Sequence, residues 1–534
     1  MRFNLLVALL GIAFASLYTA EGFLFRDYNL DEFQVATGYL KDREPALYPS
    51  DFIWAKPEMT RNLHVCVRRL MRATEAVTFG ALHEPIDLFL VWLPVCMLFF
   101  YAGIYLLCLR FTGDRVASLL VACAFMLVRR TVWDWWGLGP TYTMSARGLA
   151  MALMPLMLWA YFRCRHNMGW LALCFLAWGL VSNLHPLGGW GLLEVLGIAI
   201  LVSERFSPRA VAQVAVMGIA TMIGSIPFIM VWTHVVVIPP ELQADPAVVK
   251  SFWDGFMGLD PPPSRYFFQF LSDLIIPFVL SAAGYAWWWR HGRSGDKHEA
   301  RLLALIPAVV LTTTVLVMVG GNLLRRAGFS LPVMVPEHCR NIKMVYLTLP
   351  VWMAFALAGW RQLFKVAPSW WRMGPPVLVI FLSMTLNFPG HKLARHLLVK
   401  AGWLPAAAIE EHQKSLLNDA ADWDVAEWAR KNTPANALFY FDSYEFRYYS
   451  RRSLVFGWFD RPCVGFRPTH ELEEWIRRRD RVTPLKKARD GAGMLEAAGE
   501  YRADYLVVEN SWKQPPAKPA WSNSKYSVYE IKRQ

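Results

Sequence analysis

The stretch IDLFLVWLPVCMLFFYAGIYLLC, residues 86–108, contains only one charged residue, Asp87, at its beginning. About 20 consecutive apolar residues are enough for a helix to cross the hydrocarbon core of a bilayer. The whole chain has a similar character, because 55% of its 534 residues are apolar and only 18% are charged. Stretch and composition together predict a polytopic α-helical membrane protein rather than a set of soluble domains.

A search for comparable apolar runs predicts about eleven transmembrane helices. They lie near residues 4–20, 86–108, 116–128, 146–162, 169–184, 187–203, 210–236, 267–289, 302–320, 343–360 and 374–388. The first run also resembles a signal peptide that ends in small residues at Ala20, although Arg2 is its only basic residue before the apolar core. Cleaved or retained, this run would export the segment that follows it.

Basic residues in the short loops predict the orientation of the helices. With a cytoplasmic N-terminus, each inner loop is basic, as the positive-inside rule expects. The inner loops would carry Arg110 and Arg115, Arg163 and Arg165, Arg205 and Arg209, the group from Arg290 to Arg301, and Arg361, Lys365 and Arg372. The outer loops also contain arginines, among them Arg129, Arg130, Arg147, Arg325, Arg326 and Arg340. An odd number of spans places the C-terminus outside.

From about residue 390 the composition changes to that of a soluble domain. The segment DWDVAEWARKNTPANALFYF has a helical pattern, a break at Thr433-Pro434 and a short strand-like run. RADYLVVENS and YSVYEIKRQ read as further strands, with a basic helix, ELEEWIRRRDRV, before them. We therefore expect residues 1–389 to form the membrane domain, with a large first outer loop at 21–85, and residues 390–534 to form an extracytoplasmic α/β domain.

The first outer loop begins with FRDYNLDEFQVATGYLKD, residues 25–42, which contains four carboxylates. A solvated helix cap explains any one of them. Asp31 and Glu32 are adjacent and precede FQVATGY, a stretch that could lie flat at the membrane interface. A carboxylate held there could act as a general base, taking a proton from an acceptor hydroxyl as it attacks an anomeric carbon.

In this arrangement the chain resembles the GT-C superfamily of integral-membrane glycosyltransferases. The likeness rests on the Asp31-Glu32 pair in an exported first loop, about eleven spans, and a C-terminal α/β domain beginning near VAEWARKNTPANALF. The resemblance implies a polyprenyl-phosphate-linked sugar donor and a catalytic role for Asp31, with Glu32 beside it. No WWDYG motif of oligosaccharyltransferases is present, and WDWWG at 133–137 is not equivalent to it. Transfer to asparagine is therefore disfavoured.

Six further residues are candidates for binding the substrate. Asp134 is a second carboxylate, among tryptophans that otherwise suit an interfacial belt. His185 precedes Pro186 and two glycines, which predict a tight or re-entrant turn, and it donates either to a phosphate or to a nearby carbonyl. Arg340 is the first choice for the donor phosphate because a guanidinium binds it bidentately. Glu337, His338 and Arg325 complete the set, Arg325 having an alternative role as a membrane anchor.

These features predict a membrane glycosyltransferase of cell-envelope glycan biosynthesis, in the cytoplasmic (inner) membrane. It would transfer a sugar at the outer face with inversion, to a protein, lipid or glycan acceptor. No cofactor is required by the sequence, a divalent cation and its ligands are left open, and no nucleic acid is expected as a partner. Two alternatives stay open: a transporter or flippase for a lipid-linked glycan, and a non-catalytic assembly subunit. The segment FDSYEFRYYSRRSLVFGWFDRP, residues 441–462, suits either acceptor recognition or a packed strand hairpin, and we favour the packed hairpin.

Overall fold

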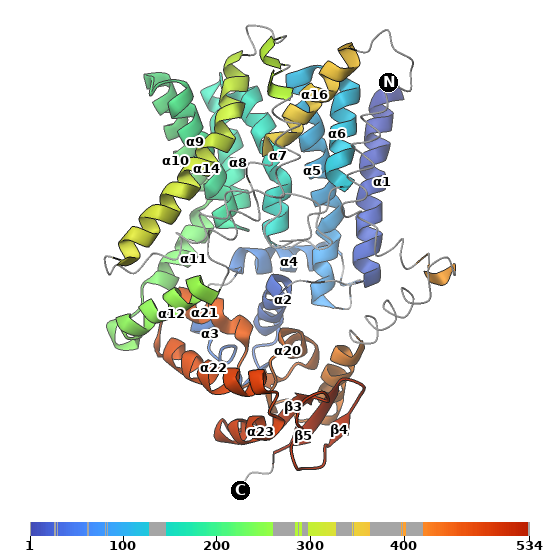
Figure 1. Cartoon of the computed structure of the whole chain (residues 1–534), viewed down its shortest axis with the longest axis vertical. Coiled ribbons are helices and arrows are strands. Elements are labelled where there is room, and N and C mark those ends of the chain that lie inside the picture. The colour runs from blue at the N-terminus through green and yellow to red at the C-terminus, as the bar shows by residue number, and fades with distance from the viewer. Residues whose placement is uncertain are drawn as a thin grey trace. The chain divides into compact units, whose positions relative to one another are not determined.

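The computed structural model of the chain separates into two compact units (Figure 1). Unit 1 comprises Met1–Asp27, Phe89–Ile229 and Phe256–Ala394, and unit 2 comprises Tyr28–Leu88, Met230–Gly255 and Arg395–Gln534. The structure describes residues 2–25, 28, 30–60, 64–78, 80, 82, 84–127, 146–259, 284–286, 288–290, 297–326, 344, 347–363, 397, 399–401 and 420–531. The two units are described separately below.

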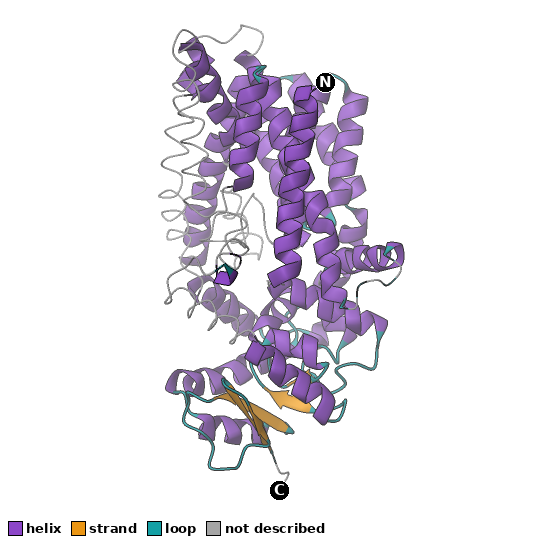
Figure 2. Ribbon diagram, turned by 90° about the vertical axis from the view of Figure 1, so that its right-hand side faces the viewer, coloured by secondary structure: helices purple, strands orange, loops and turns teal. Residues whose placement is uncertain are grey.

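Unit 1 is built from helices that run roughly side by side (Figures 1 and 2). They are α1 (Arg2–Phe25), α5 (Leu88–Thr112), α6 (Arg115–Leu127), α7 (Ala146–Cys164), α8 (Met168–Ser182), α9 (Pro186–Ser203), α10 (Pro208–Gly224), α11 (Ile226–Val236, which continues into unit 2 from Met230), α14 (Lys297–Arg326) and α16 (Leu349–Leu363). Helices therefore occupy the expected spans up to residue 236 and those at 302–320 and 343–360. The span at 374–388 and most of that at 267–289 lie outside the described residues.

Helix length limits how many of these helices qualify as membrane spans. Phe3–Leu24, Pro85–Thr112 and Lys297–Val317 are long and apolar enough to cross a bilayer. A fourth candidate is the pair Pro208–Gly224 and Ile226–Thr233, which is bent by 65°. Several other apolar helices are shorter, such as Met168–Ser182. The described residues thus show a helical protein with membrane-type helices, whereas the expected eleven spans are not shown.

Local sequence signals set where these helices begin. The side chains of Asn167 and Ser207 accept hydrogen bonds from backbone N–H groups of α8 and α10, and Pro208 stands in the first turn of α10. His185 caps α9 in the same way, followed by Pro186. The chain thus turns tightly between α8 and α9, as the sequence predicts, although the two glycines lie inside α9 rather than in the turn. Gly189 has a packing role, since a Cβ there would lie 1.9 Å from Ser182 Oγ.

Helices α8 and α10 pack through glycines. A Cβ on Gly179 would lie 2.3 Å from the carbonyl oxygen of Thr221, and a Cβ on Gly224 would lie 2.3 Å from that of Leu176. Small residues allow such close backbone approach between apolar helices. At the bend after Gly224, Asn183 donates to the Gly224 carbonyl at 2.8 Å and accepts from the Phe228 N–H at 2.8 Å. These hydrogen bonds satisfy backbone groups that the break releases from the helix.

Ion pairs join the loops at one end of unit 1. Glu299, in the first turn of α14, pairs with Arg110 at 2.9 Å and with Arg165 at 3.4 Å. Asp114, between α5 and α6, pairs with Arg361 at 2.6 Å. These arginines belong to the loops that the sequence predicts to be inner. Their grouping at one end agrees with the predicted alternation of loops.

Unit 2 contains a mixed five-stranded sheet in the order β2-β1-β3-β5-β4 (Figure 2). The strands are β1 (Leu438–Tyr440), β2 (Ser453–Leu454), β3 (Tyr505–Glu509), β4 (Trp521–Ser522) and β5 (Tyr526–Glu530). β1 is parallel to β2 and β3, whereas β5 is antiparallel to β3 and β4. The three strands expected from the sequence are β1, β3 and β5. Two-residue strands such as β2 and β4 are too short to give a pattern.

The helices of unit 2 come from the first loop, the 230–255 segment and the tail. They are α2 (Leu30–Arg43), α3 (Pro57–Thr60), α4 (Val65–Val77), η1 (Pro85–Asp87), η2 (Pro240–Leu242), α12 (Pro246–Leu259, which continues into unit 1), α20 (Tyr444–Ser450), η5 (Trp458–Asp460), α21 (Arg461–Phe466), α22 (His470–Ala488) and α23 (Gly491–Glu500). Residues 420–432 are also helical. One core cluster unites the three parts: Trp54, Phe252 and Trp475 are all buried in it. The first loop is therefore folded together with the tail.

The segment 441–462 differs from the hairpin we expected. Its central part is the helix α20, and the strands β1 and β2 on either side of it are parallel. Ser443 caps α20 by accepting from the Phe446 N–H. Alternating aromatic and charged letters suit both an amphipathic helix and a strand, so periodicity over a few residues could not separate the two.

Candidate functional site

The acidic pair Asp31-Glu32 lies in the first turn of α2. The Glu32 side chain is buried, with 1% of its surface exposed, which excludes a solvated cap for this residue. The Asp31 side chain lies outside what the structure describes. A third acid of the same stretch, Asp42, pairs with the buried Arg68 at 3.3 Å and thus has a structural role. Burial of a carboxylate is energetically costly. Glu32 is therefore the acid of this helix whose burial requires a structural or functional explanation.

The two ends of the first loop meet next to this pair. Tyr28, just before α2, donates a hydrogen bond to Asp87 in η1. Phe33, just after the acidic pair, packs edge-on against Tyr448 and Tyr449 of α20, with ring centroids 5.7 and 5.5 Å away. In the sequence, Asp31 and Glu32 therefore lie between Tyr28, which contacts the other end of the loop, and Phe33, which contacts the tail.

A buried tyrosine connects this region to a second carboxylate. The Tyr448 hydroxyl accepts from the Ile86 N–H at 3.1 Å and donates to Glu84 at 3.0 Å. Arg451 also donates to Glu84, at 3.2 Å, and its guanidinium lies 4.8 Å from the centre of the Tyr448 ring. Burial, followed by the Glu84 charge, raises the pKa of Tyr448 well above its usual value. The tyrosine therefore stays protonated and acts as a fixed hydrogen-bond donor.

We call this group the loop-end cluster: Tyr28, Phe33, Glu84, Asp87, Tyr448, Tyr449 and Arg451. Within it, Glu84 is held by a tyrosine and an arginine, and Asp87 by a tyrosine. Both carboxylates already accept hydrogen bonds from neighbours that would orient them. The cluster is therefore suited to hold α2 in place.

A second buried charge group anchors the first loop to the tail. Arg447 of α20 pairs with Asp51 at 2.9 Å and with Asp460 at 2.8 Å, and all three side chains are at most 5% exposed. Asp51 also accepts from the N–H groups of Ile53, Trp54 and Leu454. Burial alone would lower the pKa of Arg447, but the two carboxylates outweigh it and raise the pKa. This triad fixes residues 51–54 against α20 and β2.

Among the other predicted site residues, the structure describes the side chain of His185 alone. His185 uses its Nδ1 to accept from the Gly188 N–H at 3.0 Å, which is a capping role. Arg325 falls in the last turn of α14, and its side chain is not described. Asp134, Glu337, His338 and Arg340 lie outside the described residues. Within the described ranges, no three His, Cys, Asp or Glu side chains are grouped as metal ligands.

Sequence reasoning missed the members of this cluster outside α2. Glu84 and Asp87 flank Pro85 directly before an apolar span, and this position was a usable signal, since acids at a membrane edge need partners. Tyr448 and Arg451 lie more than 350 residues further along the chain, as their hydrogen bonds to Ile86 and Glu84 show. Only the folding of the first loop with the tail unites them.

Glu194 was also missed. It is an acid within the apolar helix α9, near the middle of a predicted span. An ionisable residue in such a position is a functional candidate by default.

No protein-family model matches the sequence. A comparison with curated proteins likewise finds no similar chain.

Proposed function

We propose that this protein is a membrane glycosyltransferase of the GT-C type, which uses a polyprenyl-phosphate-linked sugar as donor. The observation that supports it best is the setting of the Asp31-Glu32 pair. The pair opens a helix whose flanking residues contact the other end of the first loop and the aromatic helix α20. A catalytic carboxylate requires a rigid support of this kind, because its oxygen must be held within hydrogen-bond reach of the acceptor hydroxyl.

In this proposal Asp31 is the general base. It removes the proton of the acceptor hydroxyl while that oxygen forms a bond to the anomeric carbon, and the bond from this carbon to the lipid phosphate breaks with inversion. The phosphate leaves as an anion, so it needs cationic contacts more than a general acid. Arg340 is the proposed contact, with Glu32 supporting Asp31. The chain would reside in the cytoplasmic (inner) membrane, with unit 2 on the outer side and the basic loops of unit 1 on the inner side.

The test measures release of polyprenyl phosphate from a panel of polyprenyl-phosphate-linked sugars by the purified full-length protein in detergent, with protein, lipid and glycan acceptors supplied. Wild type should consume at least one donor of the panel. Asp31→Asn should lower the rate roughly 100-fold or more, the usual contribution of a general base. Glu44→Gln is the matched control, because Glu44 is an exposed acid just after the same helix. Consumption of no donor by wild type, or an unchanged rate in Asp31→Asn, would overturn the proposal.

A second candidate function is translocation of a lipid-linked glycan. Two features favour it: Glu194 lies inside the apolar helix α9, and the pair α10 and α11 is bent by 65°. Ionisable groups and broken helices at membrane depth are typical of transporters. Proteoliposomes with a fluorescent lipid-linked glycan separate the two functions. A transporter would move the lipid between leaflets with the sugar intact, and Glu194→Gln would stop the movement, whereas an enzyme would cleave the donor.

A further inference from the structure

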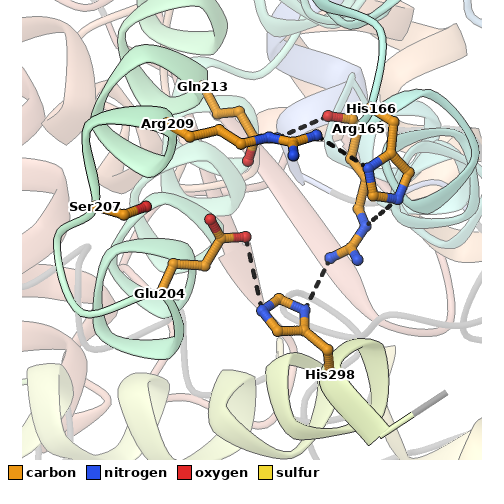
Figure 3. A pocket seen from close by; sticks show the side chains of 7 residues that line it. All are labelled: Arg165, His166, Glu204, Ser207, Arg209, Gln213 and His298. Atoms are coloured by element: carbon orange, nitrogen blue, oxygen red, sulfur yellow. Dashed lines mark hydrogen bonds and ion pairs between the residues drawn. The ribbon is translucent and has the colours of Figure 1, made fainter. Parts of the chain in front are cut away.

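Unit 1 contains a cavity of about 380 Å³ at the end where its basic loops gather. Seven polar or charged residues line it: Arg165, His166, Glu204, Ser207, Arg209, Gln213 and His298 (Figure 3). They come from the α7–α8 loop, the end of α9, the start of α10 and the first turn of α14. The candidate site discussed above uses none of them.

Hydrogen bonds hold the walls of this cavity in place. Gln213 donates through Nε2 to the Arg165 carbonyl at 2.7 Å, which ties α10 to the α7–α8 loop. The Arg165 side chain reaches Nδ1 of His298 at 3.2 Å, and Nε2 of the same ring lies 3.8 Å from Glu204. Nδ1 of His298 can accept from Arg165, while the other ring nitrogen faces the Glu204 carboxylate beyond hydrogen-bond distance. On this side of the cavity no two donors are forced together.

The side formed by His166 is not complete. Its Nε2 lies 3.2 Å from Nε of Arg165, and its Nδ1 lies 3.1 Å from Nη2 of Arg209. Both guanidiniums can only donate, whereas a neutral imidazole has a single accepting nitrogen. One of the two contacts therefore brings two donors together. An anion bound between these groups would accept a hydrogen bond from the guanidinium to which the ring offers no acceptor.

Two further observations point to a ligand. Arg209 has no carboxylate within ion-pair distance among the described residues, whereas Arg165 shares Glu299 with Arg110. Gln213 is 2% exposed, and in the described part of the chain its Oε1 accepts no hydrogen bond. The amide cannot be turned round to remove this, because Nε2 must face the Arg165 carbonyl. Within the described part of the chain, the cavity thus offers a cation without a counter-ion and a buried acceptor without a donor.

We propose that this cavity binds a phosphate group that carries, or lies beside, a hydroxyl group. Arg209 and Arg165 donate to the phosphate oxygens, His166 turns its N–H toward them, and Gln213 accepts from the hydroxyl. The shared chemistry fits both the headgroup of an anionic phospholipid, such as phosphatidylglycerol, and a soluble phosphate. None of the residues that line this cavity takes part in the proposed glycosyl transfer.

Binding at this cavity is expected to depend on pH through His166. Burial, and then the charges of Arg165 and Arg209, hold the pKa of His166 below its usual value; Arg110 adds to this effect and Glu299 opposes it. His298 and Glu204 are the other titratable groups of the cavity. A bound anion offsets the two arginines and raises the pKa of His166, so binding takes up a proton. Affinity should therefore rise as the pH falls from 8 to 6.

The test uses the full-length protein in two arms. In uncharged detergent, calorimetry follows the binding of inorganic phosphate. In the second arm, the protein is placed in nanodiscs of phosphatidylcholine with or without phosphatidylglycerol, and retained lipid is counted by native mass spectrometry. Binding in the first arm assigns a soluble phosphate, and selective retention of phosphatidylglycerol in the second assigns a lipid. The pH dependence is measured with phosphatidylglycerol, because its phosphodiester keeps one charge over this range.

Two variants and a control locate the binding. Arg209→Gln should weaken it roughly 10-fold, the usual effect of losing one charge-assisted hydrogen bond. His166→Gln should abolish the rise in affinity between pH 8 and 6. The control is Arg205→Gln, which removes the same charge from the exposed α9–α10 loop without altering the cavity lining, and it should leave the affinity unchanged. The absence of binding in both arms, or equal losses in Arg205→Gln and Arg209→Gln, would overturn the proposal.

Discussion

Replacement of Arg447 by methionine is the most direct test of how unit 2 is held together. Arg447 pairs with both Asp51 and Asp460, and the side chains of both acids are at most 2% exposed. Methionine fills a similar volume but removes the guanidinium that pairs with these two buried carboxylates. Loss of one partner from a buried ion pair typically costs about 3–5 kcal/mol. The cost corresponds to a roughly 150- to 5,000-fold increase in the population of the opened unit.

Hydrogen exchange with mass spectrometry gives the effect segment by segment in the full-length protein. Peptides covering residues 47–60 and 438–456 should lose protection by this factor in Arg447→Met at pH 7. Peptides from α8 provide an internal reference, because α8 belongs to unit 1. The control variant is Lys431→Met, which breaks an exposed pair with Glu427 and should change protection by no more than a few-fold.

The effect also has a defined pH dependence. In wild type, burial outweighs the Arg447 charge and raises the pKa of Asp460. Without the guanidinium, the pKa of Asp460 rises further above that of the unfolded chain, so the folded variant binds more protons than the unfolded one. Its stability therefore increases as the pH falls, and the gap from wild type narrows toward pH 4.5. Unchanged protection in Arg447→Met at pH 7, or a gap that widens on acidification, would refute the reasoning.

Three further outcomes are expected. Gly179→Ala should destabilise the α8–α10 contact by about 1–3 kcal/mol and lower the melting temperature in detergent, because its Cβ would overlap the Thr221 carbonyl; Gly218→Ala, which faces open space in α10, should not. Burial would raise the pKa of Glu471, but Lys56, Thr469 and a backbone hydrogen bond together outweigh it and hold the pKa below its ordinary value of 4.5. The pair therefore stabilises unit 2 above that pH and loses this contribution below it, so Lys56→Met should reduce protection at pH 7 and not at pH 3. Alkaline carbonate should leave the chain in the membrane pellet.

Much of the helical framework could be predicted from the sequence. Apolar runs at 86–108, 146–162 and 187–203 coincide with α5, α7 and α9 within a few residues. An apolar segment of this length has few alternatives to a helix when its backbone groups must be satisfied internally. The strands β1, β3 and β5 were found for a related reason, since aromatic and β-branched residues gather where a sheet is buried.

The candidate site was predictable only in part. The pattern drew attention to Asp31 and Glu32, but it could not show that Glu32 is buried or that Tyr448 lies near the same loop. His185 was expected to be a ligand or a locally bonded ring, and the structure shows a helix cap. The role of each of these residues depends on a few hydrogen bonds, and the tertiary fold decides which groups are close enough to form them. Residue type alone does not determine these partners.

The sequence by itself determined that this is a helical chain with membrane-type segments and an α/β tail, because hydrophobicity and its period act locally. Tertiary structure alone decided that the first loop folds with the tail, and that Asp51, Arg447 and Asp460 form one buried triad. It also decided that loops far apart in the chain enclose a cavity around His166. The physical reason is that the burial and pairing of charges depend on which distant segments come into contact. A local sequence pattern does not specify those contacts.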